Sequence, residues 1–374
     1  MLDRHTATIL EQCDCPEVKQ RNYWLVRTDS GAHYDDFATN DYIAIGWDYI
    51  TREMFERMSE NEIKAIIQTQ ERVSPTKEDD EELSPDRSLS GRVTAVYNKL
   101  HRFICEFREG DIVLIPSKNT SRVSIGIITG PVEENPNYVA DYLCANPSTE
   151  LSLCPYKKRR SVSWIKGISK DRIDVYLVKA FSSHHAISDI NDYADYINRE
   201  LYSFYRTDDS IHSIIRAGHP NGMSLNELKS LIDILEGTFQ EASRATGIPY
   251  DANQFQIKLN IHSPGIIEIV CGLAGCGGLL AVSMLAWNHV KNGGKLKFNM
   301  KIGNALEISA EAETLGIEGR RNEVKKMELD YQVQELNLSK GQRLRELSHT
   351  LEMEIPEINI KEDVLNIEFE DSVE

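Results

Sequence analysis

The sequence predicts an α+β protein, with a strand-rich first half flanked by helices and a mostly helical second half. Short apolar runs such as Tyr23–Arg27 and Gly110–Pro116 have the length and composition of strands, and amphipathic stretches separate them. Longer stretches at 224–246, 264–290 and 304–352 favour helices. With 374 residues, 41% hydrophobic and 27% charged, the chain is an ordinary globular protein that is long for one core.

The first half is expected to form one domain over residues 21–207. Strands are predicted at 22–28, 42–47, 111–116, 122–129, 160–167 and 173–178, and helices at 51–72, 91–107 and 188–205. Residues 1–20 are predicted to be an N-terminal arm, and the acidic, Pro/Ser-rich stretch 73–90 a mobile loop.

The second half is expected to form a module over residues 208–352, followed by an acidic tail at 353–374. A strand at 211–216 leads to a helix at 224–246, which Ser224 and Glu227 would start as a capping box. Strict alternation from Phe255 to Ile261 predicts a half-buried strand. Ser263 and Pro264 then have the pattern of a helix start, so we expect an apolar helix at 264–290 and a long charged helix at 304–352.

The apolar helix at 264–290 has three interpretations. Between Ile266 and Trp287 it carries a single charge, Glu268, and at 1.5 Å per residue it would be about 33 Å long, enough for a hydrocarbon core of about 30 Å. The glycines of this stretch permit close helix approach but weaken a helix by about 1 kcal/mol each. We favour burial in a homo-oligomer. The alternatives are contact with a membrane or a second protein, and burial in the core of a monomer.

Composition leaves several function classes open. The net charge is −17, but residues 352–374 alone hold nine acids and one lysine, so a basic patch elsewhere can still bind phosphates. No apolar signal follows Met1, and seven cysteines are an odd number, so we expect a cytoplasmic protein with free thiols. The cysteines lack zinc spacing, so neither a metal nor a cofactor is expected.

Aromatic and basic residues near strand ends are the candidate nucleic-acid contacts. Trp24, Trp47 and Trp164 are candidates for base stacking, although barrel-core packing explains Trp24 and Trp47 equally well. The polar stretch from Ser117 to Arg122 contains no acid and has the composition of a hairpin tip. The candidates for phosphate contact are Arg27, Lys118, Arg122, Lys157, Lys158, Arg159 and Arg160; Ser117 and Asn119 are candidates for reading base edges.

Five motifs in order carry a family resemblance. They are Trp24–Arg27, Ile45–Trp47, Gly110–Pro116, Ile125–Gly130 and Arg160–Trp164. Over residues 20–215 the chain resembles the N-terminal domain of Mrr-type restriction endonucleases, which is similar to the PUA/EVE group of small β-barrels. That resemblance implies a module that reads nucleic acid, often one that examines modified bases by flipping them into a pocket. The second half resembles an uncharacterised module of bacterial proteins.

The chain departs from that family where cleavage should occur. Mrr-type enzymes carry a nuclease domain with an acid followed by a Glu/Gln-x-Lys pair, and the nearest match here is Asp251 with Gln256-x-Lys258. We therefore expect a bacterial defence-type sensor of modified or foreign DNA that self-associates, and no catalytic residue. The alternatives are a diverged, metal-dependent restriction nuclease using Asp251 and Lys258, and a membrane-associated effector or protein-interaction adaptor.

Overall fold

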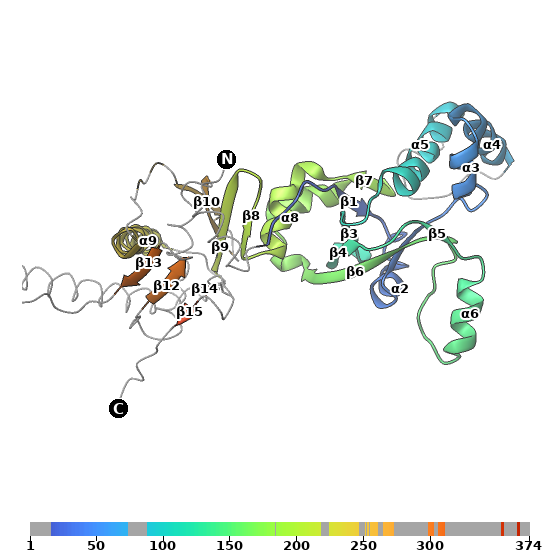
Figure 1. Cartoon of the computed structure of the whole chain (residues 1–374). Coiled ribbons are helices and arrows are strands. Elements are labelled where there is room, and N and C mark those ends of the chain that lie inside the picture. Colours follow the sequence, from blue (N-terminus) through green and yellow to red (C-terminus); the bar gives the residue numbers. More distant parts are fainter. Residues whose placement is uncertain are drawn as a thin grey trace, which may run out of the picture. The chain divides into compact units, whose positions relative to one another are not determined.

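The chain divides into two compact units. The N-terminal unit comprises residues 20–201, and the C-terminal unit comprises residues 1–19 together with 202–374 (Figure 1). The computed structural model describes residues 16–73, 88–183, 185–217, 224–246, 251, 253, 255–260, 265–272, 298–302, 306–310, 353–354 and 365–366. Residues 74–87 of the predicted loop 73–90, and most of the predicted arm and tail, lie outside these ranges.

A curled, half-barrel sheet forms the centre of the N-terminal unit. Its strands are β1 (Tyr23–Val26), β2 (Tyr42–Ile45), β3 (Ile112–Pro116), β4 (Arg122–Ile128), β5 (Glu133–Glu134), β6 (Lys158–Ser169) and β7 (Ile187–Asp189). They run in the order β2-β6-β4-β3-β1-β7, with β5 also paired to β6. Only the β1–β3 pair is parallel among these described strands.

The long strand β6 curls the sheet because its two halves pair with different neighbours. Its first residues pair with β2, and the remainder pairs with β4. The register between β4 and β6 shifts after Ile125, an irregularity of the kind that bends strands and increases their twist. At this bend a Cβ on Gly126 would lie 2.5 Å from a methyl of Val162, so only glycine fits there.

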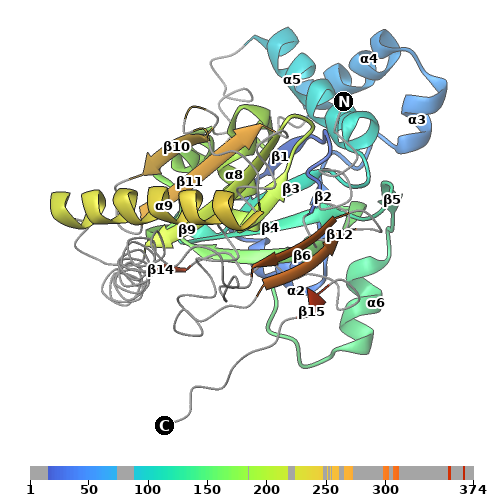
Figure 2. The same ribbon diagram turned by 60° about the vertical axis from the view of Figure 1, so that its left-hand side comes forward.

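Helices surround this sheet. They are α2 (Tyr34–Thr39), α3 (Arg52–Arg57), α4 (Glu60–Val73), α5 (Leu89–His101) with a π-helical extension (Arg102–Glu106), α6 (Tyr138–Ala145), α7 (Val175–Val178) and α8 (Ala194–Leu201). Helices α3, α4 and α5 gather at one end of the unit (Figure 2). Alternate residues of β1 and β3 enter two apolar clusters: Trp24 and Val113 belong to one, and Leu25 and Leu114 to the other.

Most predicted elements of the N-terminal unit are confirmed, with three differences. The helix predicted over 188–205 is confirmed only for α8, because Ile187–Asp189 and Phe204–Arg206 at its two ends pair with other strands and are themselves strands. The helix predicted over 51–72 is two helices, because Ser59 and Glu62 form a capping box that starts a new helix: the Ser59 amide donates to the Glu62 carboxylate at 2.7 Å. The strand predicted over 173–178 is wrong. Residues Val175–Val178 form α7, started by Asp174, whose carboxylate accepts from the amide of Tyr176.

The C-terminal unit contains two sheets and one long helix within the described residues. The first sheet has the order β10-β11-β9-β14, with β8 on β9, and the second has the order β13-β12-β15. The bounds are β8 (Phe204–Arg206), β9 (Ser210–Ala217), α9 (Leu225–Thr246), β10 (Phe255–Asn260), β11 (Gly265–Gly272), β12 (Phe298–Ile302), β13 (Leu306–Ala310), β14 (Met353–Glu354) and β15 (Leu365–Asn366). The segment before the N-terminal unit joins β8: the amide of Val18 donates to the carbonyl of Arg206.

The C-terminal unit confirms some elements and corrects others. Helix α9 starts at the predicted capping box, since the Ser224 amide donates to Glu227 and the Glu227 amide to Ser224. The helix predicted over 264–290 is wrong for residues 265–272, which form strand β11 between β10 and β9. Likewise residues 306–310 form strand β13 instead of starting the helix predicted over 304–352. Residues 273–290 and 311–350 lie outside the described ranges.

The correction of β11 also concerns the membrane interpretation. Within the part of the chain that the structure describes, no helix combines the length and the apolar character needed to cross a bilayer.

Candidate nucleic-acid interface

Trp24 is a core residue. Its side chain is 3% exposed and stacks on Phe107 with ring centroids 4.5 Å apart. The indole Nε1 donates to the buried carboxylate of Asp111 at 2.9 Å, and that carboxylate also accepts from the amides of Asn22 and Arg108. Trp24 therefore packs in the core of the barrel, and Asp111 is the hydrogen-bond partner of its indole.

Arg27 is turned toward the protein. Its guanidinium donates to the carbonyls of Phe181 and Ser183, and burial lowers its pKa. Trp164 is also held internally, since its Nε1 donates to the carbonyl of Phe37 at 2.9 Å. In both side chains, nitrogens that could contact nucleic acid are already bonded to backbone carbonyls.

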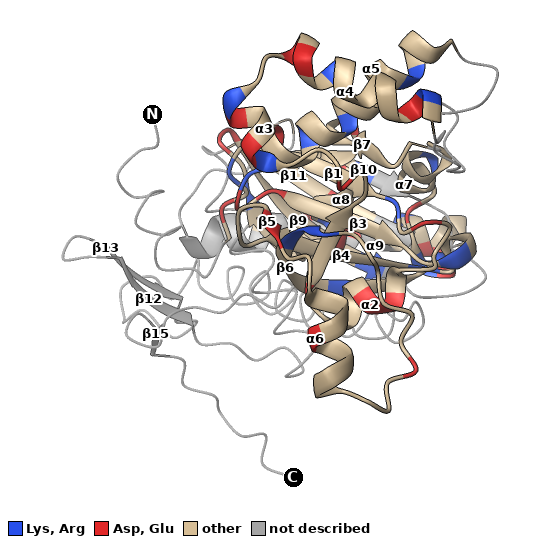
Figure 3. Cartoon of the chain, turned by 90° about the vertical axis from the view of Figure 1, so that its right-hand side faces the viewer, with Lys and Arg blue, Asp and Glu red and all other residues tan. Residues whose placement is uncertain are grey.

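The basic run on β6 lies inside the N-terminal unit. Lys158 is 1% exposed, and its ammonium donates to the carbonyl of Trp47 at 3.0 Å and to Asp48 at 3.3 Å. Burial lowers the pKa of Lys158, although Asp48 opposes this. Lys157, in contrast, is exposed. The side chains of Lys158, Arg159 and Arg160 are all buried, so this stretch of β6, one of the segments coloured blue in Figure 3, is not an exposed phosphate track.

Arg159 and Arg160 are structural cations. The guanidinium of Arg159 lies over the rings of Tyr42 and Tyr138, at 4.2 and 3.6 Å from their centroids, and donates to the carbonyl of Cys154 at 2.7 Å. Arg160 donates to three backbone carbonyls, those of Phe103, Ile104 and Gly130.

The hairpin tip between β3 and β4 is exposed, as its composition predicts. Ser117 organises the turn, since its hydroxyl accepts from the amide of Arg122 at 2.7 Å. Lys118, Asn119 and Arg122 are exposed. Asn119 and Thr120 have positive φ angles of 57° and 54°, a conformation that only the surrounding contacts hold in place for such residues.

The loop after β1 packs directly against this tip. The hydroxyl of Thr28 donates to the carbonyl of Pro116 at 2.7 Å. Gly31 has φ of 94°, and a Cβ there would lie 2.3 Å from the backbone nitrogen of Lys118. Asp29 and Ser30 also have positive φ. The two loops are therefore in backbone contact.

Two further loops, Gly46–Asp48 and Tyr156–Lys157, contact each other and the loop after β1 through the ring of Tyr156. Its ring lies 5.5 Å from that of His33 in an edge-on arrangement, and a Cβ on Gly46 would lie 3.2 Å from it. Next to Gly46, Trp47 has φ of 54° and is nearly buried, and Asp48 accepts from the amide of Lys157. We call the four segments Thr28–His33, Gly46–Asp48, Ser117–Arg122 and Tyr156–Lys157 the loop face.

A buried polar cluster lies behind the loop face. His33 is buried, and no hydrogen-bond partner of its Nδ1 is found among the described residues. Burial lowers the pKa of His33, with Arg159 adding to the effect while Asp29 and Asp36 oppose it. The Asp36 carboxylate accepts from the Tyr42 hydroxyl and the Cys154 amide. Sequence reasoning missed His33, Asp36 and Tyr156, because residues so far apart in the chain leave no local pattern.

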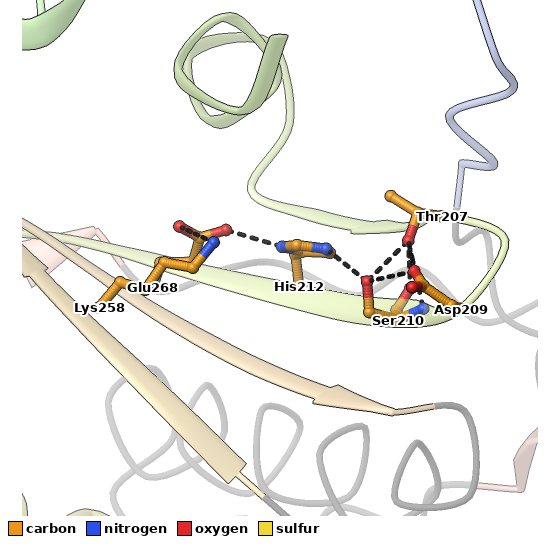
Figure 4. Close-up of polar contacts among 6 residues, drawn as sticks. All are labelled: Thr207, Asp209, Ser210, His212, Lys258 and Glu268. Carbon is orange, nitrogen blue, oxygen red and sulfur yellow. Dashed lines mark hydrogen bonds and ion pairs between the residues drawn. The ribbon is translucent and has the colours of Figure 1, made fainter. Parts of the chain in front are cut away.

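The residues of the nuclease alternative lie in the C-terminal unit. Asp251 accepts hydrogen bonds from the backbone and side chain of Asn253, and Lys258 on β10 lies 3.8 Å from the carboxylate of Glu268 on β11. In the described residues no three His, Cys, Asp or Glu side chains are gathered where they could hold a metal ion. Glu268 also bonds to His212, in a network that continues to Ser210, Thr207 and Asp209 (Figure 4). A Ser-x-His pair on one strand could have signalled it.

The comparisons with known proteins bear on the N-terminal unit. Residues 22–188 match the family described as "Domain of unknown function (DUF8426)", a range that contains the whole loop face. No curated protein and no solved structure matches the chain.

Proposed function

We propose that the N-terminal unit is a PUA/EVE-like module that binds nucleic acid, preferentially modified or foreign DNA, at the loop face, and that the protein is a defence-type sensor. One observation carries the proposal. Of the six non-glycine residues with positive φ among those described, five (Asp29, Ser30, Trp47, Asn119 and Thr120) lie in loops of this one face. Strained backbone of this kind concentrates at binding sites, where it presets the shape of the loops.

The exposed basic and polar residues of the loop face also support nucleic-acid binding there. Lys118, Arg122 and Lys157 are exposed on it and can reach phosphate oxygens, whereas the hydroxyls and amides of the hairpin tip can donate to bases or sugars. Because these contacts would be made by exposed charges, binding is expected to be sensitive to salt.

The test is DNA binding by the full-length protein with Lys118→Glu and Arg122→Glu, singly and together. Fluorescence anisotropy with modified and unmodified duplexes should show salt-dependent binding by the wild type. The double variant should bind at least about tenfold more weakly, with its slope of log K against log salt reduced by about 0.9 for each lost phosphate contact. Reversal of Lys158 or Arg159 is unsuitable, because both are buried.

The matched control is Arg57→Glu on α3, which reverses a side chain that is 76% exposed and lies outside the loop face. It should leave the affinity unchanged within about twofold, because exposed charges more than about 8–10 Å away are screened. The proposal fails if the wild type shows no salt-dependent binding to DNA. It also fails if the control variant loses as much DNA affinity as the loop variants.

The same assay separates the nuclease alternative. Metal-dependent nicking of the duplex that disappears in Lys258→Ala would assign chemistry to the C-terminal unit. Binding without nicking fits a sensor.

A further inference from the structure

A second, independent group of residues lines one face of the first sheet in the C-terminal unit. Ser210 and His212 are two apart on β9, so both side chains lie on the same face of the sheet. His212 pairs with Val270 of β11, which places Glu268, two residues earlier, on the diagonal of the same face. Figure 4 shows the resulting line of side chains from Ser210 through His212 to Glu268.

The distances in this line are those of a nucleophile, a base and an orienting carboxylate. The Ser210 Oγ lies 2.9 Å from the Nε2 of His212, and the Nδ1 of His212 lies 2.7 Å from the Oε1 of Glu268. When the Nδ1 proton faces the carboxylate, a neutral imidazole must present its Nε2 lone pair to the serine hydroxyl. His212 and Glu268 are buried, whereas Ser210 is half-buried at the start of its strand.

Neighbouring strands fix the imidazole and the carboxylate. Tyr205 of β8 is the cross-strand partner of His212, and the two rings stack at 4.4 Å with an angle of 6° between their planes. Lys258 is the cross-strand partner of Glu268, and its ammonium lies 3.8 Å from the second carboxylate oxygen. The face of the imidazole stacks on Tyr205 and its Nδ1 bonds to the carboxylate of Glu268, so the ring cannot turn without losing both contacts.

The hydroxyl proton of Ser210 has a competing acceptor. The Oγ also donates to the carboxylate of Asp209 at 3.1 Å and exchanges a hydrogen bond with the hydroxyl of Thr207 at 2.7 Å. The hydrogen bonds from Thr207 and Ser210 lower the pKa of Asp209, so its carboxylate is charged and ready to accept. Without the Asp209 carboxylate, the hydroxyl of Ser210 should donate its hydrogen bond to the Nε2 of His212 more of the time.

We propose that Ser210 is a nucleophile for activated acyl esters, with His212 as its base and Glu268 as the positioning residue. The Oγ attacks the carbonyl carbon and its proton passes to the Nε2 of His212. As the bond to the leaving group breaks, that proton passes to the leaving oxygen. Water then attacks the acyl carbon and gives a proton to His212. As the bond from that carbon to the Oγ breaks, His212 returns the proton to the Oγ and the carboxylic acid leaves, so the reaction is a hydrolysis without redox change.

The test uses a fluorophosphonate probe on the full-length protein, because this reagent loses fluoride to an activated serine and leaves a stable adduct. Mass spectrometry should place the adduct on Ser210, and Ser210→Ala should abolish it. Glu268→Gln keeps the shape of the side chain but removes its charge, and it should slow labelling by about 10²-fold, a typical contribution of general-base assistance. Glu268→Asp, which keeps a carboxylate, should recover part of the rate.

Two further variants keep the outcome decisive if a change at Glu268 unfolds the unit. Ser203→Ala removes another half-buried serine of the same unit that bonds to Arg216 instead of a histidine, and it should leave labelling unchanged. Asp209→Ala alters an exposed residue and should make labelling faster. The proposal is overturned if folded wild type is not labelled on Ser210, if folded Glu268→Gln is labelled as fast as wild type, or if Asp209→Ala is labelled no faster.

Discussion

Arg160 links two segments of backbone that flank the half-barrel. All three nitrogens of its guanidinium face backbone carbonyls, those of Phe103, Ile104 and Gly130. Burial lowers its pKa to about 10, although Asp111 opposes this. A buried cation of this kind is tolerated only because its hydrogen bonds replace those lost to water.

Replacing Arg160 should therefore destabilise the N-terminal unit strongly. Arg160→Met keeps much of the volume but leaves three carbonyls without their donor, and we expect a loss of about 3–5 kcal/mol in the free energy of unfolding. Urea unfolding followed by tryptophan fluorescence measures this. The exposed neighbour provides the control: Lys157→Met should change stability by less than about 0.5 kcal/mol. A loss below about 1 kcal/mol for Arg160→Met would contradict the structural role of this cation.

Cys154 gives the N-terminal unit a pH dependence. Its thiol is buried, and burial raises the pKa of Cys154 from 9.0 to about 12. Between these values the folded state holds a proton that the unfolded state has lost, so this contribution to stability is present below pH 9 and is lost as the pH rises toward 12. The slope for one proton is about 1.4 kcal/mol per pH unit.

Cys154→Ala should reduce the alkaline loss of stability by up to that slope between pH 9 and 12. Urea unfolding at several pH values compares the two proteins, and the difference between their slopes cancels the titration of other groups. Cys144→Ala is the control, because this thiol is exposed. Parallel curves for wild type and Cys154→Ala would contradict the prediction.

Among the structural elements, the loops of the candidate interface depend on one close approach. Gly31 has φ of 94° and no room for a Cβ beside Lys118, so both its backbone and its neighbour require glycine. Gly110 has φ of 92°, but a Cβ there would meet nothing within 4 Å, so only its backbone favours glycine. Alanine substitutions at Gly31 and Gly110 can therefore be compared: both strain the backbone, but only the one at Gly31 also displaces the hairpin tip.

Gly31→Ala should therefore weaken DNA binding, whereas Gly110→Ala should not. Both variants should lose about 1–3 kcal/mol of stability through strain, and Gly31→Ala should lose more because Lys118 must also move. Thermal unfolding and anisotropy on the same samples measure the two effects. Equal DNA affinity for Gly31→Ala and wild type would show that the contact between the loops does not shape the interface.

Elements with a clear pattern were predictable from sequence, and continuous apolar runs were not. Alternation identified β10, and the Ser224–Glu227 capping box placed the start of α9. The run Ile266–Cys271 has no alternation because residues on both faces of β11 are buried, from Ile267 to Cys271, and periodicity does not separate such a strand from a buried helix. Its single charge, Glu268, is held by His212, a residue 56 positions earlier that no local pattern connects to it.

The candidate interface was predictable only in part, for a related reason. The exposed hairpin tip follows from its polar composition, which is a local property. The burial of Lys158, Arg159 and Arg160 depends on carbonyls and rings supplied by distant segments, so a basic run gives no sign of it. The same holds for the backbone contact between Gly31 and Lys118, which lie far apart in the sequence.

At the scale of the whole molecule, the N-terminal unit is an insertion within the C-terminal one. Both large apolar clusters of the half-barrel lie within residues 20–201, while Val18 belongs with Tyr205 and Ile214 in the other unit. A fragment of residues 20–201 should therefore fold cooperatively and bind DNA with nearly the affinity of the full chain.

Circular dichroism, urea unfolding and anisotropy on this fragment check the prediction. A fragment of residues 22–188 is the informative comparison, since it covers the family match but lacks α8, whose Ile197 is part of the core. It should be less stable than 20–201. An unfolded 20–201 fragment would show that the half-barrel needs the rest of the chain.

The pairing of Val18 with Arg206 has a consequence for synthesis on the ribosome. At about 5–20 residues per second, roughly 10–50 s pass between the emergence of Val18 and the completion of β11. During that interval the segment around Val18 first lacks β8, the strand that contains Arg206, and then the rest of its sheet. The half-barrel, which follows Val18 in the sequence, is synthesised earlier than these strands. The first sheet of the C-terminal unit can be completed only after β11 and then β14 have been synthesised. A tag or modification close to Val18 should therefore disturb the unit that folds later and spare the one beside it in the sequence.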